Sequence, residues 1–170
     1  MRLLNHALVT IYKDAKAHKT RFLKRVLVFV LAGSCAIILG NMIVINITDS
    51  IPGRVFVKNP LSEVVLGSTV VFPFKHEVFP AGVEHMTKIV RCQEGQMLEK
   101  HGPHYFCDNE LIAIAKKKSK TGESLRHFEW KIGKIPEGKF FAASHHIHGF
   151  DSRYFGLIPV QNATVIERIF

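Results

Sequence analysis

The sequence has little cysteine and few acidic residues. Three cysteines in 170 residues are too few for a small fold built on a network of disulfides. There is no internal repeat and no low-complexity linker. The hydrophobic content of 47% excludes intrinsic disorder, and 170 residues make about one domain.

The shortage of acidic residues leaves a formal net charge of +9, from 23 Lys and Arg against 14 Asp and Glu. Such an excess suits a nucleic-acid-binding protein, but it is unevenly spread. Residues 1–25 hold seven basic residues and one acidic residue, which leaves the rest of the chain nearly balanced. We therefore do not expect nucleic acid to be a partner.

Charged residues are missing altogether from Val26 to Thr48. As a helix, the apolar run Val26–Ile45 would span ~30 Å, the thickness of the hydrocarbon core of a bilayer. A buried helix of a soluble protein is the alternative, which the length and lack of charge disfavour. A cleaved signal peptide is disfavoured because no small-x-small cleavage site follows the run.

We therefore expect an uncleaved transmembrane signal-anchor over residues 26–47. The seven basic residues on its N-terminal flank predict that residues 1–25 form a cytoplasmic segment. Residues 48–170 would then lie on the other side of the inner (cytoplasmic) membrane, which in a bacterium is the periplasm. The sequence thus predicts a single-pass protein.

The exported part is expected to be mainly β, with a Greek-key or barrel-like closure. Its apolar runs are short, rich in Val, Ile and Phe, and separated by Gly, Pro, Asn or Lys. No convincing amphipathic helix follows Ser50. The expected strands are Arg54–Val57, Thr69–Phe74, Lys88–Cys92, Leu111–Ala115, His127–Ile132, Lys139–Ala143, Tyr154–Ile158 and Ala163–Ile169.

Two of the cysteines, Cys92 and Cys107, fall in the exported part, and Cys35 falls in the anchor. An oxidising compartment favours a Cys92–Cys107 disulfide. The alternative is a pair of buried free thiols.

Three polar elements follow the anchor. Ser50 comes directly after it and is followed by Pro52, and Lys88 begins an apolar strand. A lysine acts as a base only when its amine is neutral, and burial lowers its pKa. Such a lysine can take the proton of a serine hydroxyl, which gives a Ser–Lys dyad. The third element is the polar and aromatic cluster of residues 150–156.

The order of these elements is specific: anchor, Ser-x-Pro, Lys-x-Val-Arg, then Asp-Ser-Arg-Tyr-Phe-Gly. It resembles the bacterial type I signal peptidase family, and more closely the TraF-type pilin-processing peptidases of conjugative transfer. The resemblance implies a mainly β, signal-peptidase-like fold preceded by one N-terminal transmembrane helix, with residues 48–170 as a periplasmic Ser/Lys peptidase domain.

The resemblance also implies a role for each matching residue. Ser50 would be the nucleophile and Lys88 the general base. The backbone N–H of Ser50 and the hydroxyl of Thr48 would form the oxyanion hole. The supporting residues would be an Asp151–Arg153 pair and Ser152, which could help to orient the lysine ammonium. No cofactor is implied.

Two glycines depart from the family pattern. Gly53 follows Pro52 directly, whereas the family commonly has Ser-x-Pro-x-Gly. Gly149 stands where the family often has a serine that supports the lysine. The general enzymes also carry a Gly-Asp-Asn stretch where this chain has residues 143–148.

That stretch contains a cluster of histidines, His145, His146 and His148. It could be a metal site, could supply the histidine of a Ser50–His–Asp151 triad, or could be a loop or the rim of a substrate groove. We favour the loop or rim and expect no metal, because no carboxylate or cysteine is spaced to complete a ligand set.

The expected function is a membrane-anchored serine endopeptidase that cleaves exported precursor proteins, pilin or other substrates of conjugation and type IV secretion. Two alternatives remain: a general signal peptidase I, and a catalytically inactive envelope assembly component of a conjugation system. The expected partners are the precursor substrate, the lipid bilayer and other proteins of the conjugation machinery. The sequence leaves open whether the product is cleaved or cyclised.

Overall fold

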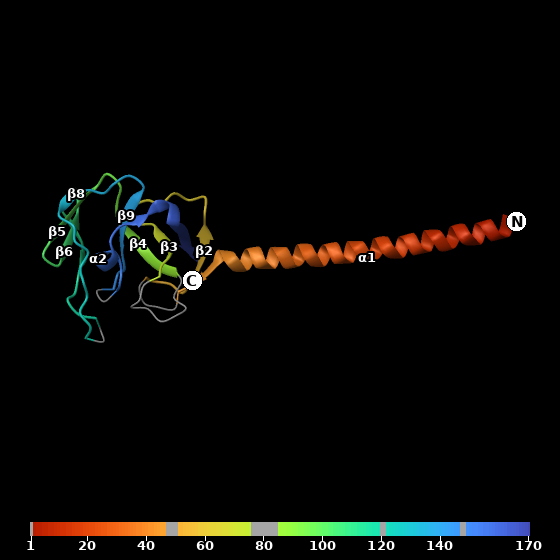
Figure 1. Cartoon of the computed structure of the whole chain (residues 1–170), viewed down its shortest axis with the longest axis horizontal. Helices are drawn as coiled ribbons and strands as arrows, with labels where there is room; N and C mark the ends of the chain where they lie inside the picture. Colours follow the sequence, from red (N-terminus) through yellow and green to blue (C-terminus); the bar gives the residue numbers. More distant parts are fainter. Residues whose placement is uncertain (1, 47–50, 76–84, 120–121, 147–148) are drawn as a thin grey trace. The chain divides into compact units, whose positions relative to one another are not determined.

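The structure is a computed structural model that describes residues 2–46, 51–75, 85–119, 122–146 and 149–170, with the backbone alone for residues 2–17. The chain divides into two compact units, Met1–Met42 and Ile43–Phe170. The first is a helix and the second is a β domain (Figure 1).

The helix α1 extends from Arg2 to Met42 without interruption, so the basic segment and the apolar segment form one helix. Its part from His18 to Met42 is long and apolar enough to cross a membrane. Large apolar side chains such as Phe29, which is 77% exposed, cover its surface. A helix that is apolar on all sides is typical of a membrane span, and α1 is compatible with a single-pass anchor.

The helix ends three residues before the apolar run does. Residues Ile43–Ile45 form strand β1, which pairs with Val55–Val57. All three residues of β1 are β-branched, which favours a strand over a helix. The helix expected as far as Ile45 therefore ends at Met42, and the prediction is wrong for Ile43–Ile45.

The β domain consists of two antiparallel sheets, and the order of the strands in each is linear within the described residues. The larger sheet contains, in order, β1 (Ile43–Ile45), β2 (Val55–Asn59), β11 (Thr164–Arg168), β3 (Thr69–Pro73), β4 (His85–Gln93), β9 (Lys139–Ala143) and β10 (Ile158–Pro159). The smaller contains β7 (Glu110–Ile114), β6 (His104–Cys107), β5 (Met97–His101) and β8 (Ile132–Lys134). The short helices α2 (Ser152–Phe155) and η1 (Val160–Asn162) precede and follow β10.

The mainly β class is confirmed, but two of the expected strands are wrong. Residues Tyr154–Ile158 mostly belong to α2 and the turn after it, because Asp151 caps a helix there. Residues His127–Ile132 reach a strand only at the last position, where β8 begins. The prediction also missed β5 and β6.

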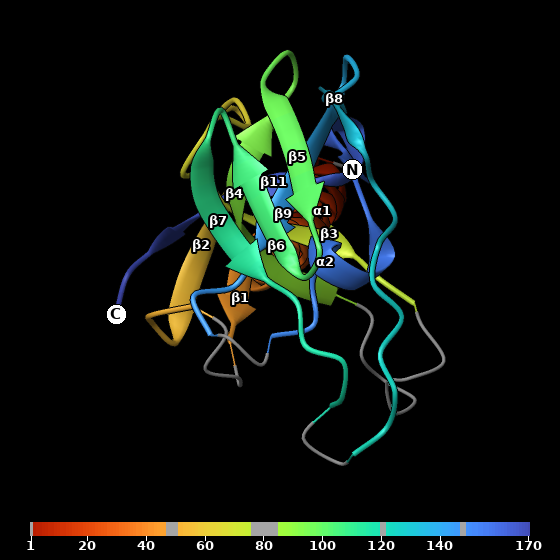
Figure 2. The same cartoon turned by 90° about the vertical axis from the view of Figure 1, so that its left-hand side faces the viewer.

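The smaller sheet packs on the larger one through a shared apolar cluster. In Figure 2, β5, β6 and β7 lie over β4 and β9. The cluster includes Leu98 and Tyr105 of the smaller sheet and Phe141 of β9, all with 0% exposure. Within it, a disulfide joins Cys92 of β4 to Cys107 of β6, with their Cα atoms 5.7 Å apart. This is the pairing that the sequence favours.

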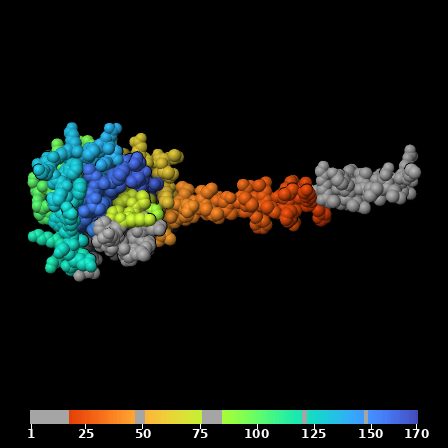
Figure 3. Space-filling view, in the orientation of Figure 1, coloured from red at the N-terminus to blue at the C-terminus, as the bar shows by residue number. Residues whose placement is uncertain are grey.

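A second cluster covers the larger sheet with residues from the C-terminal part of the chain. Ile158 and Val165 pack with Val70 and Phe72 of β3. In Figure 3 the blue C-terminal segment lies beside the yellow-green segment that includes β3. Phe150 and Phe155 also pack against this cluster, so the segment of residues 150–156 lies against β3, β4 and β9.

Candidate active site

Lys88 lies in the middle of the larger sheet. It is opposite Val70 of β3, and the next residue, Ile89, is opposite Ala143 of β9. Its exposure is only 3%. Burial lowers the pKa of Lys88 from its usual 10.5 to about 8, against a smaller raising effect of the Asp151 carboxylate and with a further lowering by the Arg153 guanidinium. Near neutral pH, a useful fraction of this amine is a neutral base.

The two charged groups that act on Lys88 form a buried ion pair. The side chains of Asp151 and Arg153 are 0% and 2% exposed. Arg153 Nε donates to Asp151 Oδ1 and Arg153 Nη2 donates to Asp151 Oδ2, both at 2.7 Å. This two-pronged geometry is the strongest form of carboxylate–guanidinium pairing. Asp151 and Arg153 therefore form an ion pair whose two charges act on Lys88, and the supporting role expected of them stays a prediction.

The local sequence explains why these two side chains meet. Asp151 is the N-cap of α2, and its Oδ1 accepts the backbone N–H of Arg153 at 3.2 Å. The helix is one turn long and ends at Gly156, whose φ of +92° suits glycine. A Cβ at this position would also lie 2.7 Å from Cε2 of Phe128.

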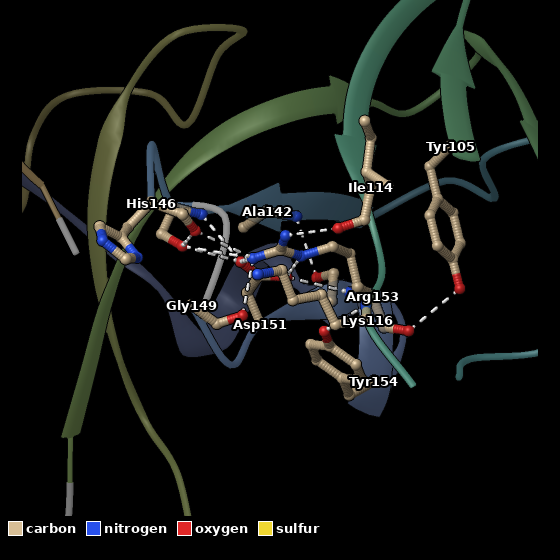
Figure 4. A network of polar contacts seen from close by, with 11 residues as sticks. Tyr105, Ile114, Lys116, Ala142, His146, Gly149, Asp151, Arg153 and Tyr154 are labelled. Atoms are coloured by element: carbon tan, nitrogen blue, oxygen red, sulfur yellow. Dashed lines mark hydrogen bonds and ion pairs between the residues drawn. The ribbon is translucent and has the colours of Figure 1, made fainter. Parts of the chain in front are cut away.

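The remaining groups of Arg153 contact the smaller sheet and the residues just before Asp151, as Figure 4 shows. Its Nη1 donates to the carbonyl of Ile114 in β7 at 2.8 Å, and its Nη2 donates to the carbonyl of Gly149 at 2.6 Å. Its own carbonyl accepts from the Tyr105 hydroxyl at 3.0 Å. Burial raises the pKa of Tyr105 well above its usual value, so the phenol remains a donor.

Ser152 is engaged with the backbone of β9. Its Oγ accepts the N–H of Ala142 at 3.0 Å, and its side chain is fully buried. This contact attaches α2 to the larger sheet. The expected role of Ser152 in orienting the lysine ammonium stays a prediction.

Ser144 was not singled out from the sequence, but the structure places it in the same network. Its backbone N–H and its Oγ both lie within hydrogen-bonding distance of Asp151 Oδ2, at 2.9 and 3.0 Å. It stands seven residues before Asp151, within the stretch of residues 143–148 that departs from the family pattern, so only its hydrogen bonds in the folded protein reveal it.

Ser50 and Thr48 lie outside the described residues, but Asn46 and Ile51 on either side of them are described. The N–H of Asn46 donates to Arg54 O at 2.9 Å, and its Nδ2 makes long hydrogen bonds to Ile51 O (3.4 Å) and Gly53 O (3.3 Å). Asn46 is 6% exposed. It therefore ties together the two ends of the segment that carries both expected catalytic hydroxyls.

The residues after Ser50 are anchored in the β domain. Ile51 belongs to a buried cluster with Val71 of β3 and Ile89 of β4. Gly53 has a φ of +113°, and a Cβ there would lie 2.5 Å from Cδ of Arg168. The shifted glycine thus serves a turn that only glycine fits.

The histidines make contacts of a structural kind. His145 Nδ1 lies 3.3 Å from Arg91 Nη2, and the carbonyl of His146 accepts from Ser144 Oγ at 3.0 Å. His148 lies outside the described residues. In the part of the chain that is described, no group of three or more His, Cys, Asp or Glu residues is placed to hold a metal ion. The carboxylate of Asp151 already accepts hydrogen bonds from Arg153 and Ser144. The Ser50–His–Asp151 triad would therefore lack the carboxylate that usually orients its histidine.

No protein-family model matches the chain, and no curated protein matches it. Among solved structures, the chain is similar to a signal peptidase I from Enterococcus faecalis V583, with 15% sequence identity and a TM-score of 0.40. The similarity covers 62% of this chain and 97% of that one.

Proposed function

We propose that the protein is a membrane-anchored serine endopeptidase in which Lys88 is the general base and Ser50 the nucleophile. The observation that carries the proposal is the buried Lys88 amine, with a pKa of about 8, beside the buried Asp151–Arg153 pair. An interior lysine that is not needed for packing is costly, and perturbed amines of this kind are concentrated at functional sites.

The reaction follows from these groups. The neutral Lys88 amine takes the proton of Ser50 as its Oγ attacks the scissile carbonyl carbon. The Ser50 N–H and the Thr48 hydroxyl stabilise the oxyanion. The Lys88 ammonium then gives its proton to the leaving amine, and water hydrolyses the acyl-enzyme by the same steps in reverse.

The anchor favours a substrate that is itself tethered in the membrane, because Ser50 follows α1 by only eight residues. We place the β domain on the periplasmic side, from the basic residues that precede the span. The substrates would be exported precursors, and the TraF-type motif order favours pilin precursors or other conjugation substrates over those of a general signal peptidase.

The test uses the full chain in detergent, incubated with a pilin precursor and followed by intact-mass spectrometry. Ser50→Ala and Lys88→Ala should each abolish cleavage while the proteins remain folded. Lys134→Ala, which removes an exposed lysine of β8, is the matched control and should cleave normally. Near-normal cleavage by Lys88→Ala would overturn the dyad.

The same experiment tests whether the protein is inactive and whether its product is cyclised. Complete absence of processing by the folded wild-type protein would favour the inactive assembly component. A product lighter by one water than the linear peptide would show that the acyl-enzyme is resolved by cyclisation.

A further inference from the structure

The space beside Gly149 is filled by the side chain of Ser144. A Cβ built on Gly149 would overlap Ser144 Oγ and would lie 2.8 Å from Ser144 Cβ. It would also lie 3.1 Å from the carbonyl oxygen of His146. Only a residue without a side chain fits at position 149 while Ser144 keeps this position, so the space beside Gly149 is occupied by the hydroxyl of Ser144, the residue that follows β9.

Ser144 is also aligned with Lys88 across the sheet. Ile89 of β4 is paired with Ala143 of β9, so one further step of the antiparallel register sets Ser144 opposite Lys88. Opposite residues project their side chains from the same face of a sheet. Both are buried, at 8% and 3% exposure.

The hydrogen bonds of Ser144 leave its Oγ able to accept a further hydrogen bond. A hydroxyl has one proton and two acceptor sites. Ser144 Oγ has two acceptors for that one proton, Asp151 Oδ2 and the carbonyl of His146, each at 3.0 Å. As an acceptor, Ser144 Oγ receives only a long hydrogen bond from Arg153 Nη2, at 3.5 Å.

We propose that Ser144 is the positioning residue for Lys88: its Oγ accepts an N–H of the Lys88 amine and so aims the amine lone pair at the nucleophile. The inference rests on the proposed function. In the reaction, the lone pair of Lys88 takes the proton of Ser50, and the ammonium passes a proton to the leaving amine. Ser144 keeps its own proton throughout and acts only through orientation.

The first test measures the pKa of the Lys88 amine directly. In the full-length protein with ¹³C-labelled lysine, the Lys88 signal, assigned by its loss in Lys88→Met, is titrated by NMR. Ser144→Ala retains the backbone N–H that binds Asp151 and loses only the hydroxyl. Removing an acceptor that favours the charged amine should lower the pKa of Lys88 further.

Ser152→Ala is the matched comparison, since it also removes a buried hydroxyl of the same network. Ser152→Ala should lower the melting temperature, because the N–H of Ala142 loses its acceptor. Because the proposal gives the orienting role to Ser144 in place of Ser152, the pKa of Lys88 should be unchanged in Ser152→Ala. The proposal is overturned if Ser152→Ala moves the titration and Ser144→Ala does not.

A second test moves the hydroxyl. Gly149→Ser alone should be destabilised by the overlap with Ser144. The exchange Ser144→Gly with Gly149→Ser should relieve the overlap and restore activity, whereas Ser144→Ala should lower kcat by about 10²-fold through misplacement of the base. Failure of the exchange to recover activity above Ser144→Ala, in a protein that melts like wild type, would count against the proposal.

The two hypotheses fail separately. If the wild-type protein does not cleave the precursor but Ser144→Ala still lowers the pKa of Lys88, the proposed peptidase function is wrong and the contact between Ser144 and Lys88 stands. If cleavage depends on Ser50 and Lys88 but the titration and kcat are unchanged in Ser144→Ala, the positioning role is wrong.

Discussion

At the scale of the residue, burial of the Lys88 amine should be visible in the stability of the protein. The folded pKa is about 8 and the usual value is 10.5, so between these pH values the unfolded chain binds more protons than the folded one. Stability of the wild type should therefore rise with pH across this window, relative to a variant without the amine. The full effect is on the order of 3 kcal/mol.

Lys88→Met should accordingly be the more stable protein at pH 7, and its advantage should shrink between pH 8 and about 10.5. Urea unfolding of both proteins across this range measures the difference. Lys134→Met provides the control for an exposed lysine. Parallel pH dependence of Lys88→Met and wild type would contradict the burial of a titrating amine.

The Asp151–Arg153 pair leads to a second prediction at this scale. Arg153→Met leaves the fully buried carboxylate without its partner, which should cost about 3–5 kcal/mol of folding free energy. Differential scanning calorimetry compares it with Arg126→Met, which removes an exposed guanidinium and should stay within about 0.5 kcal/mol of wild type. Equal melting temperatures of the two variants would show that the pair contributes little.

Site residues that belong to a sequence motif could be predicted. Site residues that are recognised only by their contacts in the folded protein could not. The resemblance of the Asp-Ser-Arg run to the family implied the ion pair, and the structure shows how it forms: Asp151 caps α2, and its carboxylate accepts from the Arg153 side chain. Ser144 and Asn46 depend on partners that are near only after the strands pair and the loop closes. No spacing in the sequence indicates either contact.

At the scale of the element, the turn after Pro52 gives a third prediction. Gly53→Ala meets both a φ of +113° and the side chain of Arg168, whereas Gly67→Ala meets a φ of +85° with open space around it. Gly53→Ala should therefore lose about 1–3 kcal/mol of stability relative to wild type. Gly67→Ala should lose less. Thermal unfolding of the two variants tests this, and equal losses would mean that Arg168 simply moves aside.

The strands that were predicted are those rich in Val, Ile and Phe, such as β3 and β4. The strand β5 reads Met-Leu-Glu-Lys-His, which has little β preference. It forms because Gly102, with a φ of +59°, lies between β5 and β6 and the two strands pair along their whole length. Pairing within the β5–β6 hairpin and the helix cap at Asp151 therefore outweigh local composition.

At the scale of the whole molecule, the disulfide between β4 and β6 supports a fourth prediction. Unfolded, unreduced protein should titrate a single thiol, that of Cys35. Reduction should lower the stability of the β domain by about 3 kcal/mol, the value for a closed loop of about 15 residues. Cys35→Ala is the control, with no titratable thiol and unchanged stability. Three thiols in the wild type would contradict the cross-link.

The division into a helix and a β domain could be predicted at this scale because charge and hydropathy change sharply along the chain. The packing of one sheet on the other could not. It depends on buried side chains such as Tyr105 and Phe141, which are far apart in the sequence.

The cross-link also bears on how the protein is made. With the β domain on the oxidising side as proposed, the bond between the sheets forms only after translocation. Until then the nascent chain lacks the constraint that a closed loop imposes on its unfolded ensemble, and it remains easier to thread through a translocation channel. Maturation of the protein would then depend on the thiol-oxidising machinery of the envelope, so a strain deficient in that machinery should accumulate less of the protein.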